Sequence, residues 1–104
     1  MGSADCANTA TIVWLDGEHD ASSVAELSET IARAIAVDDS DVILDMSEVT
    51  FMSAATVGVL VRARNFLNLR SRSLTVRAPS KCTRRILEIC ELGDLFAPDE
   101  LLVA

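Results

Sequence analysis

Short apolar runs rich in β-branched residues alternate along this 104-residue chain with segments whose apolar residues recur at helical spacing. The runs at residues 9–15, 42–46 and 73–78 predict buried strands, and a helical segment follows each of them. This alternation predicts an α/β fold with a mainly parallel or mixed sheet. Three helices are too few to cover both faces of the sheet, so we expect either one covered face or a loosely closed sheet.

The three expected helices cover residues 24–35, about 54–69 and 79–93. The apolar stripe expected for the first helix consists of Val24, Leu27, Ile31, Ala34 and Ile35. The inner face of the third helix is expected to comprise Cys82, Ile86, Ile89 and Cys90. Residues 16–20 and 47–50 are rich in turn formers, so we expect turns after the first two strands. Leu95 and Phe96 are expected to pack the C-terminal tail against the core.

The length and the 50% hydrophobic content predict one domain, residues 1–104, with its own core at about 10–97. No apolar run approaches the ~20 residues that cross a bilayer, so we expect no membrane insertion. The N-terminus lacks the pattern of a secretory signal. Three cysteines without an export signal favour a reducing compartment, and we expect the protein in the cytoplasm.

The net charge of −7 is distributed unevenly along the chain. Residues 1–50 hold eleven acids and one base, whereas residues 62–85 hold eight bases and no acid. The overall acidity and the lack of aromatic residues among the arginines argue against nucleic acid as a partner. The asymmetry fits either a solvated surface or a charge-complementary protein interface.

No pattern in the sequence predicts catalysis, a cofactor or a metal site. His19 is the only histidine and lies in an acidic segment without a nucleophile pattern, so we expect it at the surface. Cys82 lies in the first turn of a predicted helix, where a thiol pKa can fall, which makes it a candidate redox residue. The alternative is that Cys82 is a small core residue. We therefore expect a protein that is not an enzyme.

Three stretches together carry a family resemblance: "GEHD" at 17–20, "VILDMSEVTFM" at 42–52, and the small residues that lead into "VGVLV". Their order and spacing resemble the STAS domain, and in particular the bacterial anti-sigma factor antagonists. The resemblance implies a mixed sheet of four or five strands with helices mainly on one side. The fourth strand would come from "SADCANTA" at 3–10, as an edge strand, unless this end of the domain is shortened.

The resemblance also implies a mechanism. Such an antagonist binds an anti-sigma factor, a kinase of the histidine-kinase-like ATPase fold, and so frees a sigma factor for transcription. The kinase can phosphorylate a serine at the start of the second helix, which blocks the contact by charge and bulk. The family motif there is close to Asp-Ser-Ser-Gly-Leu-Gly, following "FM" or "FI".

This chain departs from that motif. With "FM" and Gly58 aligned, Ser53 replaces the acid and Ala55 stands where the phosphorylated serine is expected. Thr56 replaces the usual glycine. Alanine cannot accept a phosphate, so the resemblance implies an antagonist that is not controlled by phosphorylation at this position. Alternatively, the acceptor has moved to Thr56 or Ser53, although Ser53 is also a candidate N-cap.

The expected docking surface lies where the second helix starts. Its expected residues are Gly17, Glu18, Asp20, Met52, Ser53, Ala54, Ala55, Thr56 and Val59. We expect Arg62 and Arg64 to flank it. A different reading is a STAS interaction module of another system, such as a transporter ATPase subunit or a stress-signalling scaffold. The sequence leaves the oligomeric state open.

Overall fold

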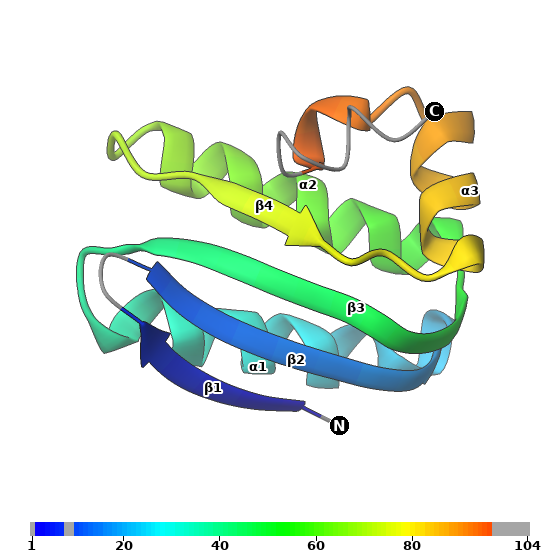
Figure 1. The fold of residues 1–104 in the computed structure, drawn as a ribbon, viewed down its shortest axis with the longest axis horizontal. Helices are drawn as coiled ribbons and strands as arrows, with labels where there is room; N and C mark the ends of the chain where they lie inside the picture. Colours follow the sequence, from blue (N-terminus) through cyan, green and yellow to red (C-terminus); the bar gives the residue numbers. More distant parts are fainter. Residues whose placement is uncertain (1, 8–9, 97–104) are drawn as a thin grey trace.

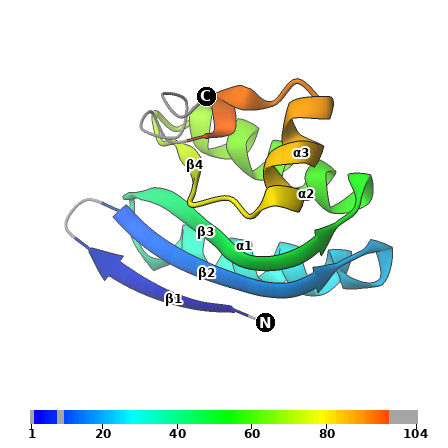
Figure 2. The ribbon, with the colours of Figure 1, turned by 45° about the vertical axis from the view of Figure 1, so that its right-hand side comes forward.

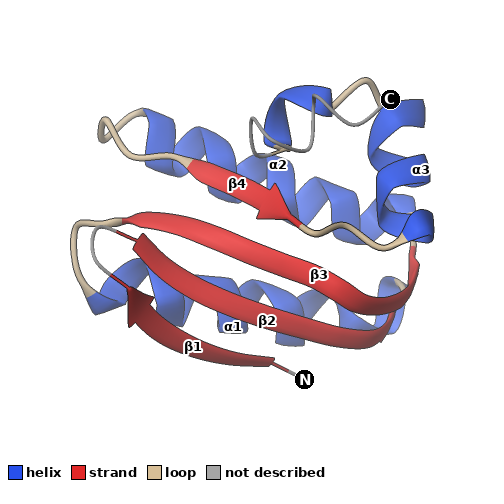
Figure 3. Ribbon diagram, viewed as in Figure 1, coloured by secondary structure: helices blue, strands red, loops and turns tan. Residues whose placement is uncertain are grey.

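The computed structural model describes residues 2–7 and 10–96, with the backbone alone for residues 2–7. The strands are β1 (Gly2–Ala7), β2 (Ala10–His19), β3 (Asp41–Met52) and β4 (Leu74–Arg77). The helices are α1 (Val24–Val37), α2 (Ala54–Asn68) and α3 (Lys81–Ile89), with short 3₁₀ turns η1 (Ala21–Ser23) and η2 (Gly93–Leu95). Figures 1 and 3 show this alternation of strands and helices.

The strands form one mixed sheet in the order β1-β2-β3-β4. The inner three, β2, β3 and β4, are parallel, and β1 pairs antiparallel with β2 as an edge strand. Part of the stretch at residues 3–10 therefore forms the expected edge strand. Because β2 and β3 are parallel, their carboxyl ends meet at one end of the sheet, where the chain enters η1 and α2 (Figure 2).

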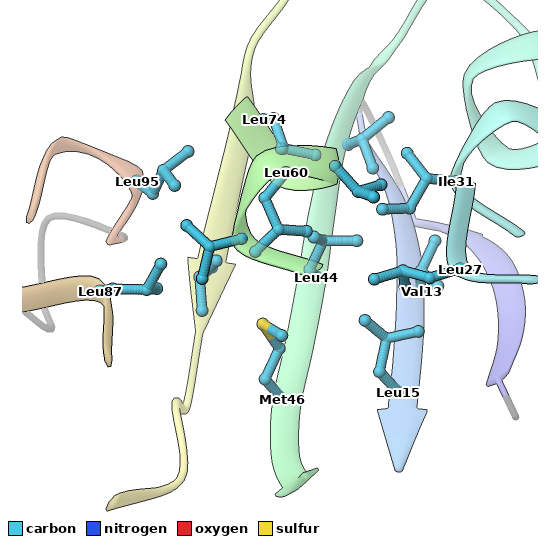
Figure 4. Packing of buried hydrophobic residues seen from close by; sticks show 14 of the residues in the cluster. Val13, Leu15, Leu27, Ile31, Leu44, Met46, Leu60, Leu74, Leu87 and Leu95 are labelled. Carbon is cyan, nitrogen blue, oxygen red and sulfur yellow. The ribbon is translucent and has the colours of Figure 1, made fainter. Parts of the chain in front are cut away.

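The helices α1 and α2 lie side by side behind the sheet, and α3 and η2 close the side beyond β4 (Figure 1). Figure 4 shows Leu27 and Ile31 of α1 beside Val13 of β2, and Leu60 of α2 over Leu44 of β3. All five side chains are almost completely buried. The apolar stripe expected for the first helix is thus confirmed, and Leu95 and Phe96 are buried as expected. Residues 97–104 lie outside the described residues.

Two strands are longer than their apolar runs predicted. β2 continues to His19 and β3 to Met52, so neither 16–20 nor 47–50 forms the expected turn. The two strands stay paired through shifts in register between Trp14 and Asp16 and between Gly17 and Glu18. Irregularities of this kind interrupt the alternation of buried and exposed side chains, but the backbone ladder between β2 and β3 continues beyond them.

The third helix begins as expected but shows a different face to the core. The Ser80 hydroxyl accepts a hydrogen bond from the Thr83 backbone amide, as an N-cap should. Thr83 and Leu87 are buried, whereas Ile89 and Cys90 are exposed. The expected inner face was wrong for these last two residues, and the helix ends at Ile89 rather than near Gly93.

The sheet face opposite the helices carries an ion pair beside an aromatic ring. Arg77 Nε donates to Asp45 Oδ2 at 2.9 Å, and its guanidinium lies 5.9 Å from the centre of the Trp14 ring. Asp45 Oδ1 also accepts from the amide and hydroxyl of Ser47. Burial is the largest single effect on the pKa of Asp45 and raises it, but these hydrogen bonds and the Arg77 charge together lower it below its usual value.

Candidate docking surface at the start of α2

The start of α2 is tied to the end of β2 by backbone and side-chain hydrogen bonds. The Ser53 amide donates to the His19 carbonyl oxygen at 2.9 Å. The Thr56 hydroxyl lies 3.2 Å from the same oxygen and 2.7 Å from the Ser53 carbonyl oxygen. These contacts place the first turn of α2 directly beside the last residues of β2.

Thr56, one of the two candidate phosphoacceptors, is completely buried. Its hydroxyl faces the carbonyl oxygens of His19 and Ser53, and a carbonyl oxygen can only accept a hydrogen bond. The hydroxyl proton is therefore directed into the protein. A kinase would have to open this turn before it could reach the oxygen.

Ser53, the other candidate, occupies the N-cap position of α2 as expected, but its hydroxyl makes no cap hydrogen bond. The backbone carbonyl oxygen of Ser53 accepts from the amides of Thr56 and Val57 instead. The Ser53 hydroxyl is itself buried and has no hydrogen-bond partner among the described residues. Both candidate acceptors thus have hydroxyls that are shielded from solvent.

Small residues form the exposed surface of this turn. Ala54 and Ala55 are exposed, and Gly58 is half-buried one turn later. A Cβ placed on Gly58 would lie 3.5 Å from Arg62 Nη1, so the arginine folds back over the glycine. Arg62 has no ion-pair partner in the part of the chain that the structure describes.

Phe51 is a large exposed apolar residue at the end of β3 and was not among the residues expected at the surface. Its side chain is 47% exposed, and its backbone lies opposite Glu18 in the β2–β3 ladder. Successive side chains of a strand face opposite sides of the sheet, so one of Phe51 and Met52 had to face outward, and Met52 was the one expected at the surface.

The expected residues of β2 and its turn lie beside α2. Gly17 has a φ of +75°, Glu18 is exposed, and Asp20 is exposed just before η1. The Asp20 carboxylate accepts from the amide and hydroxyl of Ser22, and these hydrogen bonds lower the pKa of Asp20. Asp20 therefore caps η1 and keeps its negative charge at this edge.

Three of the expected surface residues instead point inward. Met52 and Val59 are each 4% exposed, and Thr56 is fully buried. Their side chains pack in the core on the inner side of the first turn of α2, beneath the exposed alanines. The expectation that these three side chains line the surface was wrong.

His19 is buried at 1% exposure, so its expected place at the surface was also wrong. Its Nε2 lies 2.9 Å from the carbonyl oxygen of Asp16. Because that oxygen only accepts, Nε2 carries the proton in this contact. Nδ1 is buried without a partner among the described residues. His19 thus packs as a structural residue beneath the junction, as the last residue of β2.

Two further expectations concern residues near the surface. Arg64 does not flank it freely, because its guanidinium pairs with Asp94 of η2 at 2.5 Å. Cys82 is half-buried, and its Sγ lies 3.4 Å from the Val49 carbonyl oxygen and 3.3 Å from the Ser80 hydroxyl. The thiol is packed into the contact between α3 and β3. This position favours the alternative that Cys82 is a small core residue over a redox role.

Within residues 2–7 and 10–96, no group of three or more histidine, cysteine or acidic side chains lies close enough to hold a metal ion. No described helix is long and apolar enough to span a bilayer. These residues instead bring together an uncharged helix start, an exposed aromatic ring, and charges at the border. This arrangement is suited to contact with another protein.

These features define an α/β domain that exposes a small, uncharged helix start beside the carboxyl ends of its parallel strands. The family model of the STAS domain matches residues 3–102, so the chain belongs to the STAS domain family. The resemblance seen in the sequence is thereby confirmed. No curated protein matches the sequence at a significant level.

Solved structures of anti-sigma factor antagonists are similar to this chain. One from Mycobacterium paratuberculosis has a TM-score of 0.81 at 21% identity, over 98% of this chain and 90% of that one. The antagonist SpoIIAA in its unphosphorylated form has a TM-score of 0.72 at 19% identity, over 93% and 86%. SpoIIAA of Bacillus in its phosphorylated form has a TM-score of 0.71 at 21% identity, over 93% and 89%. At these identities the likeness establishes the shared fold.

Proposed function

We propose that this protein is an anti-sigma factor antagonist that is not controlled by phosphorylation at the start of α2. It binds an anti-sigma factor of the histidine-kinase-like ATPase fold and so frees a sigma factor for transcription. The role requires only binding and no catalytic step by this chain, and it places the protein in the cytoplasm. Similarity to SpoIIAA and to the mycobacterial antagonist supports an anti-sigma factor as the partner.

The observation that carries the proposal is the chemistry of the first turn of α2. Ala55, at the position that the family resemblance assigns to the acceptor serine, is exposed and has no hydroxyl. The hydroxyls of Ser53 and Thr56 on either side of it are shielded from solvent. SpoIIAA has been observed in phosphorylated and unphosphorylated forms, whereas this turn offers a kinase no exposed hydroxyl.

The charge around the turn supports a protein partner. Glu18 and Asp20 lie at one border, and Arg62 lies over Gly58 at the other. Phe51 is exposed opposite Glu18 in the β2–β3 ladder, and Ala54 and Ala55 are exposed at the start of α2. A partner that fits this surface has a small apolar contact region flanked by a base and an acid.

The proposal is tested by binding to the anti-sigma factors of the source organism, measured by isothermal titration calorimetry. Ala55→Arg places a bulky charge in the centre of the surface and is expected to weaken binding at least tenfold. Ala36→Arg makes the same change on an exposed alanine at the far end of α1 and should leave the affinity unchanged. If none of these kinases binds the wild-type protein, the proposal is wrong, and a transporter ATPase subunit or a stress-signalling scaffold becomes the better reading.

A further inference from the structure

A groove of about 570 Å³ lies between α1 and α2, apart from the exposed alanines at the start of α2. Its lining includes Ile31 and Ile35 of α1 and Val59, Ala63 and Phe66 of α2. The volume falls within the range of roughly 300–1,000 Å³ that small-molecule sites occupy. The groove is open on one side, so a ligand can enter without unfolding either helix.

Small side chains of α1 form the groove. Ala32 and Ala36, one turn apart, line it and are exposed to solvent. Phe66 is 42% exposed on the opposite wall, which is a large apolar surface to leave in water. An apolar chain placed along these residues would remove this surface from solvent, which is favourable at about 25 cal/mol per Å².

The charges at the groove are mainly positive, although the protein as a whole carries a charge of −7. Three arginines and a single acid, Asp39, line it. One of the arginines, Arg72, has a structural role, because it donates to the carbonyl oxygens of Ile35, Asp38 and Ser40. Arg72 anchors the C-terminal end of α1 and lines the groove at that end.

The other two arginines have capacity to bind an anion. The Arg70 guanidinium stacks 3.7 Å from the centre of the Phe66 ring, and Nη1 donates to the Phe66 carbonyl oxygen. This contact holds the guanidinium at the groove while its other N–H groups stay available. Neither Arg70 nor Arg62 has an ion-pair partner among the described residues. A guanidinium held in this way binds carboxylate or phosphate oxygens in pairs.

We propose that the groove between α1 and α2 binds an anionic amphiphile, with an apolar chain along Phe66 and a carboxylate or phosphate head at Arg70. Charge complementarity selects this class of ligand, because arginines at the border of an apolar floor attract an anionic head group and repel a cationic one. The site goes beyond docking of an anti-sigma factor, and it can be tested without that partner.

The test titrates decanoate and decyl phosphate separately into the full-length protein and follows backbone amide NMR shifts. We expect saturable shifts concentrated in α1 and in the second half of α2. Decanol and decylamine, which share the chain and lack the negative charge, should bind at least tenfold more weakly. The stronger of decanoate and decyl phosphate identifies the preferred head group.

Arg70→Gln removes the stacked charge at an exposed position and is expected to weaken binding about tenfold. Arg85→Gln makes the same change on the exposed surface of α3, outside the groove, and should leave binding unchanged. Ala63→Trp fills the groove and should abolish binding, with its amide spectrum checking that the fold is intact. Equal losses in Arg70→Gln and Arg85→Gln, equal affinity for decanol, or no saturable shifts would each overturn the proposal.

Discussion

The hydroxyl of Thr56 lies 3.2 Å from the carbonyl oxygen of His19, thirty-seven residues earlier in the chain. This contact joins the first turn of α2 to the last residue of β2. It fixes the turn that exposes Ala54 and Ala55, and it directs the threonine hydroxyl away from solvent. The same hydrogen bond therefore positions the proposed docking surface and shields a candidate phosphoacceptor.

Thr56→Val keeps the shape of the side chain and removes this donor. Both carbonyl oxygens retain backbone donors, from Ser53 on one side and from residues 56 and 57 on the other. The loss in free energy of unfolding should therefore be only about 1 kcal/mol. Urea denaturation measures it. Thr50→Val, at an exposed position of β3, is the matched control and should change stability by less than about 0.5 kcal/mol.

Gly17→Ala tests the backbone at the edge of the docking surface. Gly17 has a φ of +75°, and a Cβ there would meet no heavy atom within 4 Å. Any destabilisation therefore comes from backbone strain alone, and about 1 kcal/mol is expected. Gly93→Ala also meets no atom within 4 Å but lacks the positive φ, so it should be nearly neutral. Equal effects in the two variants would show that the conformation of Gly17 is not the cause.

Asp45→Asn tests the ion pair on the open sheet face. The pKa of Asp45 is lowered in the folded protein, so the unfolded chain binds more protons in the acidic range and stability falls as the pH falls. The contribution is complete above the unfolded pKa of about 3.9 and is lost as the pH falls through the lower folded value. Asp45→Asn should lower the free energy of unfolding by about 1.5 kcal/mol near neutral pH. The loss is modest because Arg77 is partly exposed, and solvent weakens the ion pair.

Urea denaturation as a function of pH checks this prediction. The difference in free energy of unfolding between wild type and Asp45→Asn should shrink as the pH falls below about 4. Glu88→Gln, an exposed acid of α3, is the control and should leave the profile unchanged. A difference that stays constant down to the lowest pH would mean that the ionised Asp45 carboxylate does not stabilise the fold.

Ala55→Ser restores a hydroxyl at the exposed position of α2. We expect the variant to gain one phosphate when it is incubated with its anti-sigma factor kinase, ATP and Mg²⁺, and then to lose affinity for that kinase, because the phosphate adds charge and bulk to the surface. Intact mass spectrometry measures the change. Ala54→Ser places a hydroxyl one residue earlier, on a different side of the helix, and should stay unmodified.

The order of elements and the core of α1 could be predicted because both depend on local periodicity. The extensions of β2 and β3 could not, since residues 16–19 and 47–50 have the composition of turns and become strands only by pairing with each other. The burial of His19 has the same origin. It follows from the pairing with Met52 and the packing of α2 above it, neither of which has a local signal.

The face of α3 was ambiguous for a different reason. Its short sequence offers two apolar stripes, one through Cys82 and Ile86 and one through Leu87. Contact with β3, far away in the sequence, buries Leu87 completely, while Cys82 and Ile86 pack against the core only in part. At the docking surface, the small residues Ala54 and Ala55 could be predicted from the motif, but the inward orientation of Met52 and Val59 depends on how α2 meets the sheet.

One measurement tests the central claim most directly. The wild-type protein is incubated with the anti-sigma factor kinase that binds it, together with ATP and Mg²⁺, and complex formation and intact mass are followed together. The account predicts a stable complex and an unchanged mass, because the first turn of α2 exposes no hydroxyl. A gain of one phosphate that disappears in Thr56→Ala or Ser53→Ala would contradict it.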